Sequence, residues 1–159
     1  MTGIVNRELK KDKSQVSILI ADDDADDRML TKEAFEENHV INPIHFVNDG
    51  EELMAYLRKE GKYADKEIYP QPGMILLDLN MPRKDGREAL AEIKSHPELR
   101  RIPVIVLTTS KAEEDVIRSY NLGVNCFITK PVTFNSLVEV TRMLGKYWFE
   151  IVELPPAIE

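Results

Sequence analysis

Short apolar runs alternate with segments of helical periodicity along this chain, and this alternation restricts its fold more than any other feature. The apolar runs cover 16–21, 44–47, 74–77, 104–107 and 126–128. Strands that alternate with helices predict a parallel sheet covered on both faces. Because crossovers between parallel strands are right-handed, few topologies remain. We expect an α/β, doubly wound sheet of five parallel strands with helices on both faces.

Apolar residues three or four positions apart predict a helix after each strand. The helices are expected over 26–38, from Gly50 past Leu57, around 89–93, around 116–120 and from Phe134 onward. Residues 60–73 are read as a long polar loop closed by two prolines. We expect a polar arm at 1–15, the folded domain at 16–145, and an extension of the last helix with a tail at 146–159.

Composition excludes several classes of protein. Hydrophobic residues make up 43% and charged residues 31% of the 159 residues, which is typical of a globular domain. The single cysteine, Cys126, excludes an internal disulfide and a zinc site built from cysteines. The net charge of −7 argues against nucleic acid or anionic lipid as a partner. No apolar run reaches the length of a bilayer, and the first residues lack a signal-peptide core, so we expect a cytoplasmic protein.

Charged and hydroxyl residues follow the predicted strands where these end. Asp22 and Asp23 follow the first strand, Asp78 the third, Thr108 the fourth and Lys130 the fifth. Ligands of open parallel sheets bind beyond the carboxyl ends of the strands. Three carboxylates at one edge repel one another unless a cation is present, and oxygen ligands suit Mg²⁺. The sequence therefore predicts a Mg²⁺ site at this edge.

These residues supply the parts for phosphoryl transfer to an aspartate. A carboxylate attacks, Mg²⁺ shields the charge, and a lysine and a hydroxyl steady the phosphoryl oxygens. Asp78 is the expected nucleophile, because it ends the central strand, between the acids of the first strand and Thr108.

The same residues carry a resemblance to the receiver domains of response regulators. The motifs are Asp22-Asp23, Asp78 within the segment LLDLNMPRKDG, Thr108, and Lys130-Pro131, each at a predicted strand end. The resemblance covers about residues 16–145 and implies a flavodoxin-like fold, with the strands in the order 2-1-3-4-5. It also implies that Asp78 is the phosphoacceptor, in a protein that assists its own phosphorylation and dephosphorylation but is not otherwise an enzyme.

A narrower resemblance is to the stand-alone response regulators of cyanobacterial-type phytochromes. It is carried by the segments RIPVIVLTTS (101–110), YNLGVNC (120–126) and YWFEIVELPP (147–156), and by the long loop at 60–73. This resemblance implies a phytochrome-type histidine kinase as phosphoryl donor. It also implies Mg²⁺ ligands from Asp22, Asp23, Asp78 and the backbone carbonyl of Asn80.

The resemblance also implies contacts and a switch beyond the metal. Thr108 and Lys130 would contact the phosphoryl group, and the peptide bond between Lys130 and Pro131 would be cis. Movement of Thr108 toward the phosphoryl group would leave space for the ring of Phe127 to turn inward. The family often has tyrosine at this position. Compared with tyrosine, Phe127 keeps the bulk of the ring but lacks the hydroxyl group.

The end of the chain carries more large apolar side chains than one helix face can bury. They are Tyr147, Trp148, Phe149, Ile151 and Val152. Exposed apolar surface usually marks an interface, so we expect a homodimer through the fourth helix, fifth strand, fifth helix and tail. The alternative is a tail that folds back over its own domain.

Two other functions remain open from the sequence. A phosphatase with an aspartyl-phosphate intermediate often has an acid two residues after the nucleophile, where this chain has Asn80, which cannot act as a general acid. A phosphorylation-independent interaction module is the second, and the complete set of five site residues speaks against it. Taken alone, the acids at 22–24 are also what a helix N-cap requires.

Overall fold

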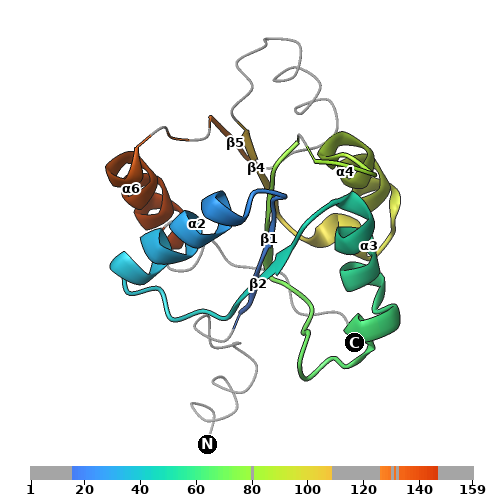
Figure 1. Ribbon diagram of the computed structural model, residues 1–159. Coiled ribbons are helices and arrows are strands. Elements are labelled where there is room, and N and C mark those ends of the chain that lie inside the picture. The colour runs from blue at the N-terminus through green and yellow to red at the C-terminus, as the bar shows by residue number, and fades with distance from the viewer. Residues whose placement is uncertain (1–15, 80, 109–125, 130, 132, 147–159) are drawn as a thin grey trace, which may run out of the picture.

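Five parallel strands form one sheet in the computed structural model, in the order β2-β1-β3-β4-β5 (Figure 1). The structure describes residues 16–79, 81–108, 126–129, 131 and 133–146. The strands are β1 (Ile18–Ala21), β2 (Ile44–Val47), β3 (Met74–Leu77), β4 (Val104–Thr108) and β5 (Cys126–Thr129). This confirms the predicted fold class and strand order.

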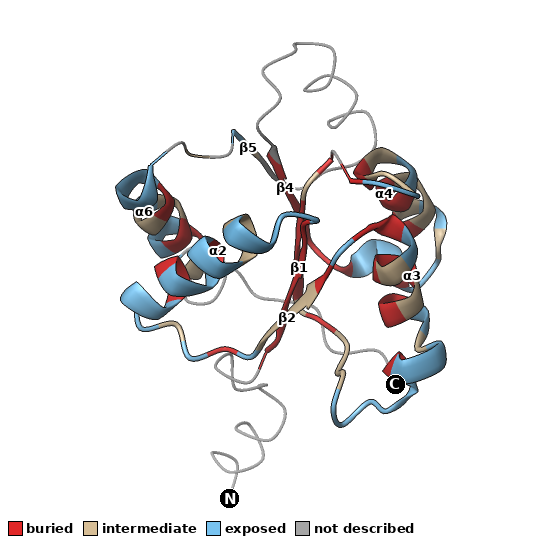
Figure 2. Cartoon of the chain, viewed as in Figure 1, coloured by how far each residue is buried: buried red, intermediate tan, exposed pale blue. Residues whose placement is uncertain are grey.

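Helices cover both faces of the sheet. They are α2 (Ala25–Glu37), α3 (Gly50–Arg58), α4 (Gly86–Ser95) and α6 (Phe134–Gly145), with short 3-10 helices η2 (Gly61–Ala64) and η3 (Leu99–Arg101). Helices α2 and α6 lie on one face, and α3 and α4 lie on the other (Figure 1). The buried side of each helix is turned toward the sheet (Figure 2).

The sheet separates two apolar cores. Ile18 and Ile20 of β1 pack with Phe35 of α2, whereas Leu19 and Ala21 belong to the core beneath α3 and α4. Since successive side chains of a strand point to opposite faces, a strand covered on both sides must be apolar at every position. This explains why the strands appear in the sequence as unbroken apolar runs.

A side-chain N-cap begins each of the four α-helices in the described part of the chain. The caps are Asp24 for α2, Asp49 for α3, Asp85 for α4 and Thr133 for α6. Such a cap pairs a backbone N–H that has no partner within its helix, and each contributes about 1 kcal/mol. The interpretation of Asp24 as a capping residue is thereby confirmed.

The predicted strand boundaries agree with the structure to within two residues. β2 and β3 have the predicted bounds, β1 begins two residues later, and β4 and β5 each extend one residue further. The predicted helix around 116–120, the arm at 1–15 and the tail at 147–159 lie outside the described residues. None of the described helices is both long and apolar enough to span a bilayer.

The segment 60–73 differs from the predicted polar loop. It contains η2, and the ring of Tyr63 is buried against those of Tyr56 and Tyr69, with centroids 5.1 and 4.9 Å away. The Tyr56 hydroxyl donates to the carbonyl of Pro70, and the Tyr63 hydroxyl donates to Glu52. Two tyrosines in a polar stretch give no periodicity, so the sequence pattern did not reveal this small core.

Candidate functional site

The acidic residues lie together because β1 and β3 are neighbours in the sheet. Ala21 pairs with Leu77, so the residues that follow, Asp22 and Asp78, leave the sheet side by side. The ladder continues past both strands, since the Asp78 amide donates to the Ala21 carbonyl and the Asp22 amide donates to the Val47 carbonyl. The backbone at these two aspartates is therefore fixed by the sheet.

The carboxylates of Asp22, Asp23 and Asp78 form one cluster. One oxygen from each lies within 4.8 Å of the others. Asp22 is only 5% exposed, Asp78 is half-buried and Asp23 is exposed. Three negative charges at this separation repel one another strongly, and a bound cation removes that repulsion. The cluster fits a hard divalent cation, which prefers carboxylate oxygens and retains some of its water.

Two contacts hold Asp22 in place at the start of α2. Its carboxylate accepts a hydrogen bond of 2.9 Å from the Asp24 amide. Its backbone carbonyl accepts one of 2.7 Å from the guanidinium of Arg28. Arg28 was not identified from the sequence, because a contact across six residues of a loop and helix start leaves no pattern there.

The chain after Asp78 turns back closely on itself. The Gly86 amide donates to the Leu79 carbonyl at 2.9 Å. A Cβ atom at Gly86 would lie 2.4 Å from the carbonyl oxygen of Asp78, so only glycine fits at the start of α4. The DG pair at 85–86 therefore serves both as a helix cap and as the closing point of the loop that follows Asp78.

Helix dipoles add positive potential at the same edge of the sheet. Helices α2 and α4 both begin there, shortly after the strands that carry the acids. A helix N-terminus presents unpaired amide groups and about half a positive charge, which favours an anion such as a phosphoryl group. The edge thus combines an acidic cluster for a cation with surroundings that favour an anion.

The remaining predicted residues are described only in part. The backbone of Thr108 ends β4 and is in register with Thr129 at the end of β5, at the same edge as the acids. The side chains of Thr108 and Phe127 lie outside the described residues. So do Asn80, Lys130 with the predicted cis peptide bond, and the tail residues Tyr147, Trp148, Phe149, Ile151 and Val152.

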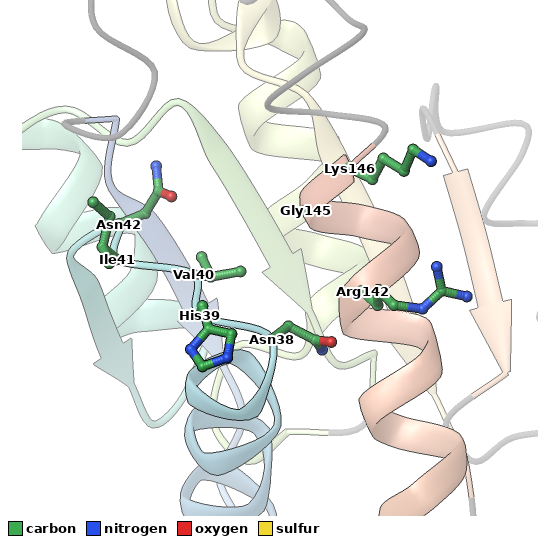
Figure 3. A pocket seen from close by; sticks show the side chains of 8 residues that line it. All are labelled: Asn38, His39, Val40, Ile41, Asn42, Arg142, Gly145 and Lys146. Carbon is green, nitrogen blue, oxygen red and sulfur yellow. The ribbon is translucent and has the colours of Figure 1, made fainter.

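A pocket of about 270 Å³ lies away from the acidic cluster, between the ends of α2 and α6 (Figure 3). Val40 and Gly145 approach each other at its floor, and a Cβ atom on Gly145 would lie 3.3 Å from a Val40 methyl group. Because both helices end here, the pocket is at the edge of the sheet opposite Asp78. It does not contribute to the candidate site.

Comparisons with known proteins agree with this arrangement. The family described as response regulator receiver domain matches residues 18–142. Response regulator Rcp1 of Synechocystis is 45% identical over 143 residues, which cover 90% of this chain and 95% of that protein.

Two solved structures are similar to this one over most of its length. The phosphorylated cyanobacterial phytochrome response regulator RcpA superposes with a TM-score of 0.83 at 45% identity, covering 89% of this chain and 99% of that chain. The Mn²⁺-bound form of Rcp1 superposes with a TM-score of 0.80 at 44% identity and the same coverage. With its sheet order and its acidic cluster, the chain belongs to the response regulator receiver domain family.

Proposed function

We propose that this receiver domain accepts a phosphoryl group on Asp78. The observation that carries the proposal is the cluster of three carboxylate oxygens within 4.8 Å, with Asp78 at the end of the central strand β3. A carboxylate oxygen of Asp78 forms the new O–P bond while the bond from phosphorus to the donor's leaving group breaks. Asp78 is half-buried, so it is not closed off from a donor.

The other site residues have distinct roles in this proposal. Asp22 and Asp23 hold a divalent cation together with Asp78 and the backbone carbonyl of Asn80. Thr108 donates its hydroxyl proton to a phosphoryl oxygen, and the ammonium of Lys130 pairs with another. These groups compensate the charge that the phosphoryl group brings to an already acidic edge.

We assign Mg²⁺ as the physiological cation. When bound, it supplies neutralisation of the charge on the transferring phosphoryl group. Its preference for a few carboxylates, a carbonyl and water matches the residues at this edge. The Mn²⁺-bound structure of Rcp1, a related protein, supports a divalent cation of this kind.

The donor in this proposal is a phytochrome-type histidine kinase. The support is the likeness to RcpA, which was solved as a phosphorylated cyanobacterial phytochrome response regulator, and to Rcp1. Such a kinase works in the cytoplasm, so the proposal locates the protein there. The acidic net charge of −7 agrees with a protein partner rather than a nucleic acid.

Phosphorylation would be read out through Thr108 and Phe127. Thr108 moves toward the phosphoryl group, and the Phe127 ring turns into the space that is left. Thr108 lies on β4 and Phe127 lies on β5, and these two strands are neighbours in the sheet, with Val106 in register with Phe127. Without a tyrosine hydroxyl, the inward position of the ring rests on packing alone.

A homodimer is the assembly that we propose. The support is the run of apolar residues from Tyr147 to Val152, which is longer than one packed helix face accommodates. Together with the region between β4 and α6, this tail would form the interface.

The phosphorylation proposal is tested by incubating the protein with Mg²⁺ and a small phosphodonor such as acetyl phosphate, and reading its intact mass. The expected result is one acid-labile phosphoryl adduct on the wild type and none on Asp78→Asn. Chelation of the metal should abolish the adduct. A wild type that stays unmodified with both the small donor and a phytochrome kinase would instead indicate a phosphorylation-independent interaction module.

A further inference from the structure

The loop between Leu79 and Gly86 follows the phosphoacceptor directly, and α3 fixes it from one side. The Gly50 amide, at the start of α3, donates to the Lys84 carbonyl at 2.8 Å. A Cβ atom at Gly50 would lie 2.1 Å from that carbonyl oxygen, so the two backbones are in direct contact. The position of the loop is thus tied to the N-terminus of α3, which lies beside α4 on the same face (Figure 1).

An ion pair between Asp49 and Arg83 reinforces this contact. The Arg83 guanidinium lies 2.8 Å from one carboxylate oxygen of Asp49. The other oxygen of Asp49 caps α3 by accepting from the Glu52 amide at 2.8 Å. Asp49 is only 3% exposed, and these two partners compensate the loss of water around its carboxylate. A single buried carboxylate therefore joins the helix start to the loop.

The backbone at Arg83 also needs such a restraint. Its φ angle is +61°, in the left-handed region that residues other than glycine rarely adopt. Nothing about an exposed arginine favours this conformation by itself. The ion pair with Asp49 supplies a reason for an arginine at this turn, because only a long cationic side chain reaches the buried carboxylate from here.

We propose that Asp49 and Arg83 are positioning residues for phosphoryl transfer to Asp78. Their ion pair holds the loop after Asp78 against α3, and so orients the Asp78 carboxylate toward the cation. The inference rests on the proposed function, since it assigns these residues to the same reaction. Neither residue touches the phosphoryl group or the metal.

Three variants distinguish the effect of the ion pair from the effects of the backbone at Arg83 and of the helix cap at Asp49. Arg83→Gly removes the cation and relaxes the left-handed backbone. Asp49→Asn keeps a side-chain oxygen to cap α3 and removes the charge. Arg83→Lys keeps a positive charge. Arg58→Gln is the matched control, because it removes an ion pair that joins α3 to α4, Arg58 with Glu92, while the other carboxylate oxygen of Glu92 keeps its ion pair with Lys84 of the loop.

Three quantities are measured on each full-length variant: the Mn²⁺ dissociation constant by calorimetry, the rate of phosphorylation by acetyl phosphate at saturating Mg²⁺, and the melting temperature. We expect Arg83→Gly and Asp49→Asn to phosphorylate about ten-fold more slowly and to bind Mn²⁺ several-fold more weakly. Arg83→Lys should recover most of the rate. Arg58→Gln should stay within about two-fold of the wild type, as an exposed ion pair contributes little.

The inference is overturned if Arg83→Gly and Asp49→Asn keep the wild-type rate and Mn²⁺ affinity. It is equally overturned if their losses match that of Arg58→Gln or simply follow the melting temperature. If the wild type itself is not phosphorylated, the proposed function fails. The Mn²⁺ dissociation constants then decide the inference separately: unchanged values contradict it, and weakened values in both variants support it.

Discussion

Single residues at this site have roles set by their neighbours rather than by their type. Asp22, Asp23 and Asp24 are consecutive and chemically identical. Asp22 and Asp23 face Asp78, whereas Asp24 accepts from the amides of Asp26 and Asp27 at the start of α2. These different roles arise because the backbone changes from strand to helix after β1. Two potential metal ligands and a helix cap therefore follow one another in the sequence.

Removing one acid from the cluster should have opposite effects with and without metal. Asp23→Asn relieves like-charge repulsion, so the metal-free protein should melt at a higher temperature than the wild type. The same change removes a cation ligand, so added Mg²⁺ should raise its melting temperature less. Thermal unfolding with and without Mg²⁺ measures both effects. A variant that is less stable than the wild type without metal would contradict the like-charge account.

Lys59 makes stability depend on pH in a defined window. Its ammonium lies 4.3 Å from the Tyr56 ring centroid and donates to the Tyr69 carbonyl. Burial, with a smaller contribution from Lys66, lowers the pKa of Lys59 from 10.5 to about 8. The folded state therefore releases this proton at lower pH than the unfolded state, and the free energy of unfolding gains a term that rises with pH between about 8 and 10.5.

This dependence is measured by urea unfolding at pH 8 and pH 9.5, comparing the wild type with Lys59→Met. Between these two pH values, the free energy of unfolding of Lys59→Met is expected to rise less, or to fall more, than that of the wild type. The comparison stops at pH 9.5 because burial raises the pKa of Tyr56 and Tyr63, and titration of unfolded tyrosine then lowers stability. Equal pH dependence in both proteins would contradict the assignment.

Among the helices and strands, the junction between β3 and α4 has the most direct effect on the phosphoacceptor. Gly86 begins α4 and packs directly against the backbone of Asp78. Gly86→Ala would force a methyl group to within 2.4 Å of the Asp78 carbonyl oxygen, which lies in fixed backbone. We expect a loss of about 2 kcal/mol in stability and slower phosphorylation of Asp78.

The matched control for this prediction is Gly145→Ala. Gly145 lies at a helix end too, the last residue of α6, but its new Cβ would lie 3.3 Å from a side-chain methyl group of Val40 rather than from backbone. We expect a change below about 1 kcal/mol, because a side chain can move aside more easily than backbone. Chemical unfolding compares the two variants, and similar losses in both would contradict a specific constraint at Gly86.

The strands could be predicted from the sequence because a sheet covered on both faces leaves only apolar residues in its strands. Their order came from the resemblance to receiver domains. Asp22, Asp23 and Asp78 could be predicted as one cluster because parallel strands end at one edge. The contacts of Arg28, Asp49 and Arg83 could not, since they depend on loop geometry. The buried ring of Tyr63 could not either, because its partners Tyr56 and Tyr69 come from separate segments without a shared period.

The oligomeric state of the whole molecule is expected to depend on the C-terminal tail. A chain truncated after Lys146 keeps every described element from β1 to α6 and loses the apolar residues from Tyr147 onward. We expect it to be a monomer, with circular dichroism like that of the wild type. Light scattering measures the mass of both proteins. A truncated chain that remains a dimer would contradict the proposed role of the tail.

The phosphoryl group is expected on Asp78 and on no other aspartate. Borohydride reduces an aspartyl phosphate to homoserine, which peptide mass spectrometry can locate after treatment of the protein with Mg²⁺ and a small phosphodonor. The account predicts homoserine at position 78 and at no other aspartate. Homoserine at position 22 or 23, or reduction at several aspartates equally, would contradict the assignment of Asp78 as the phosphoacceptor.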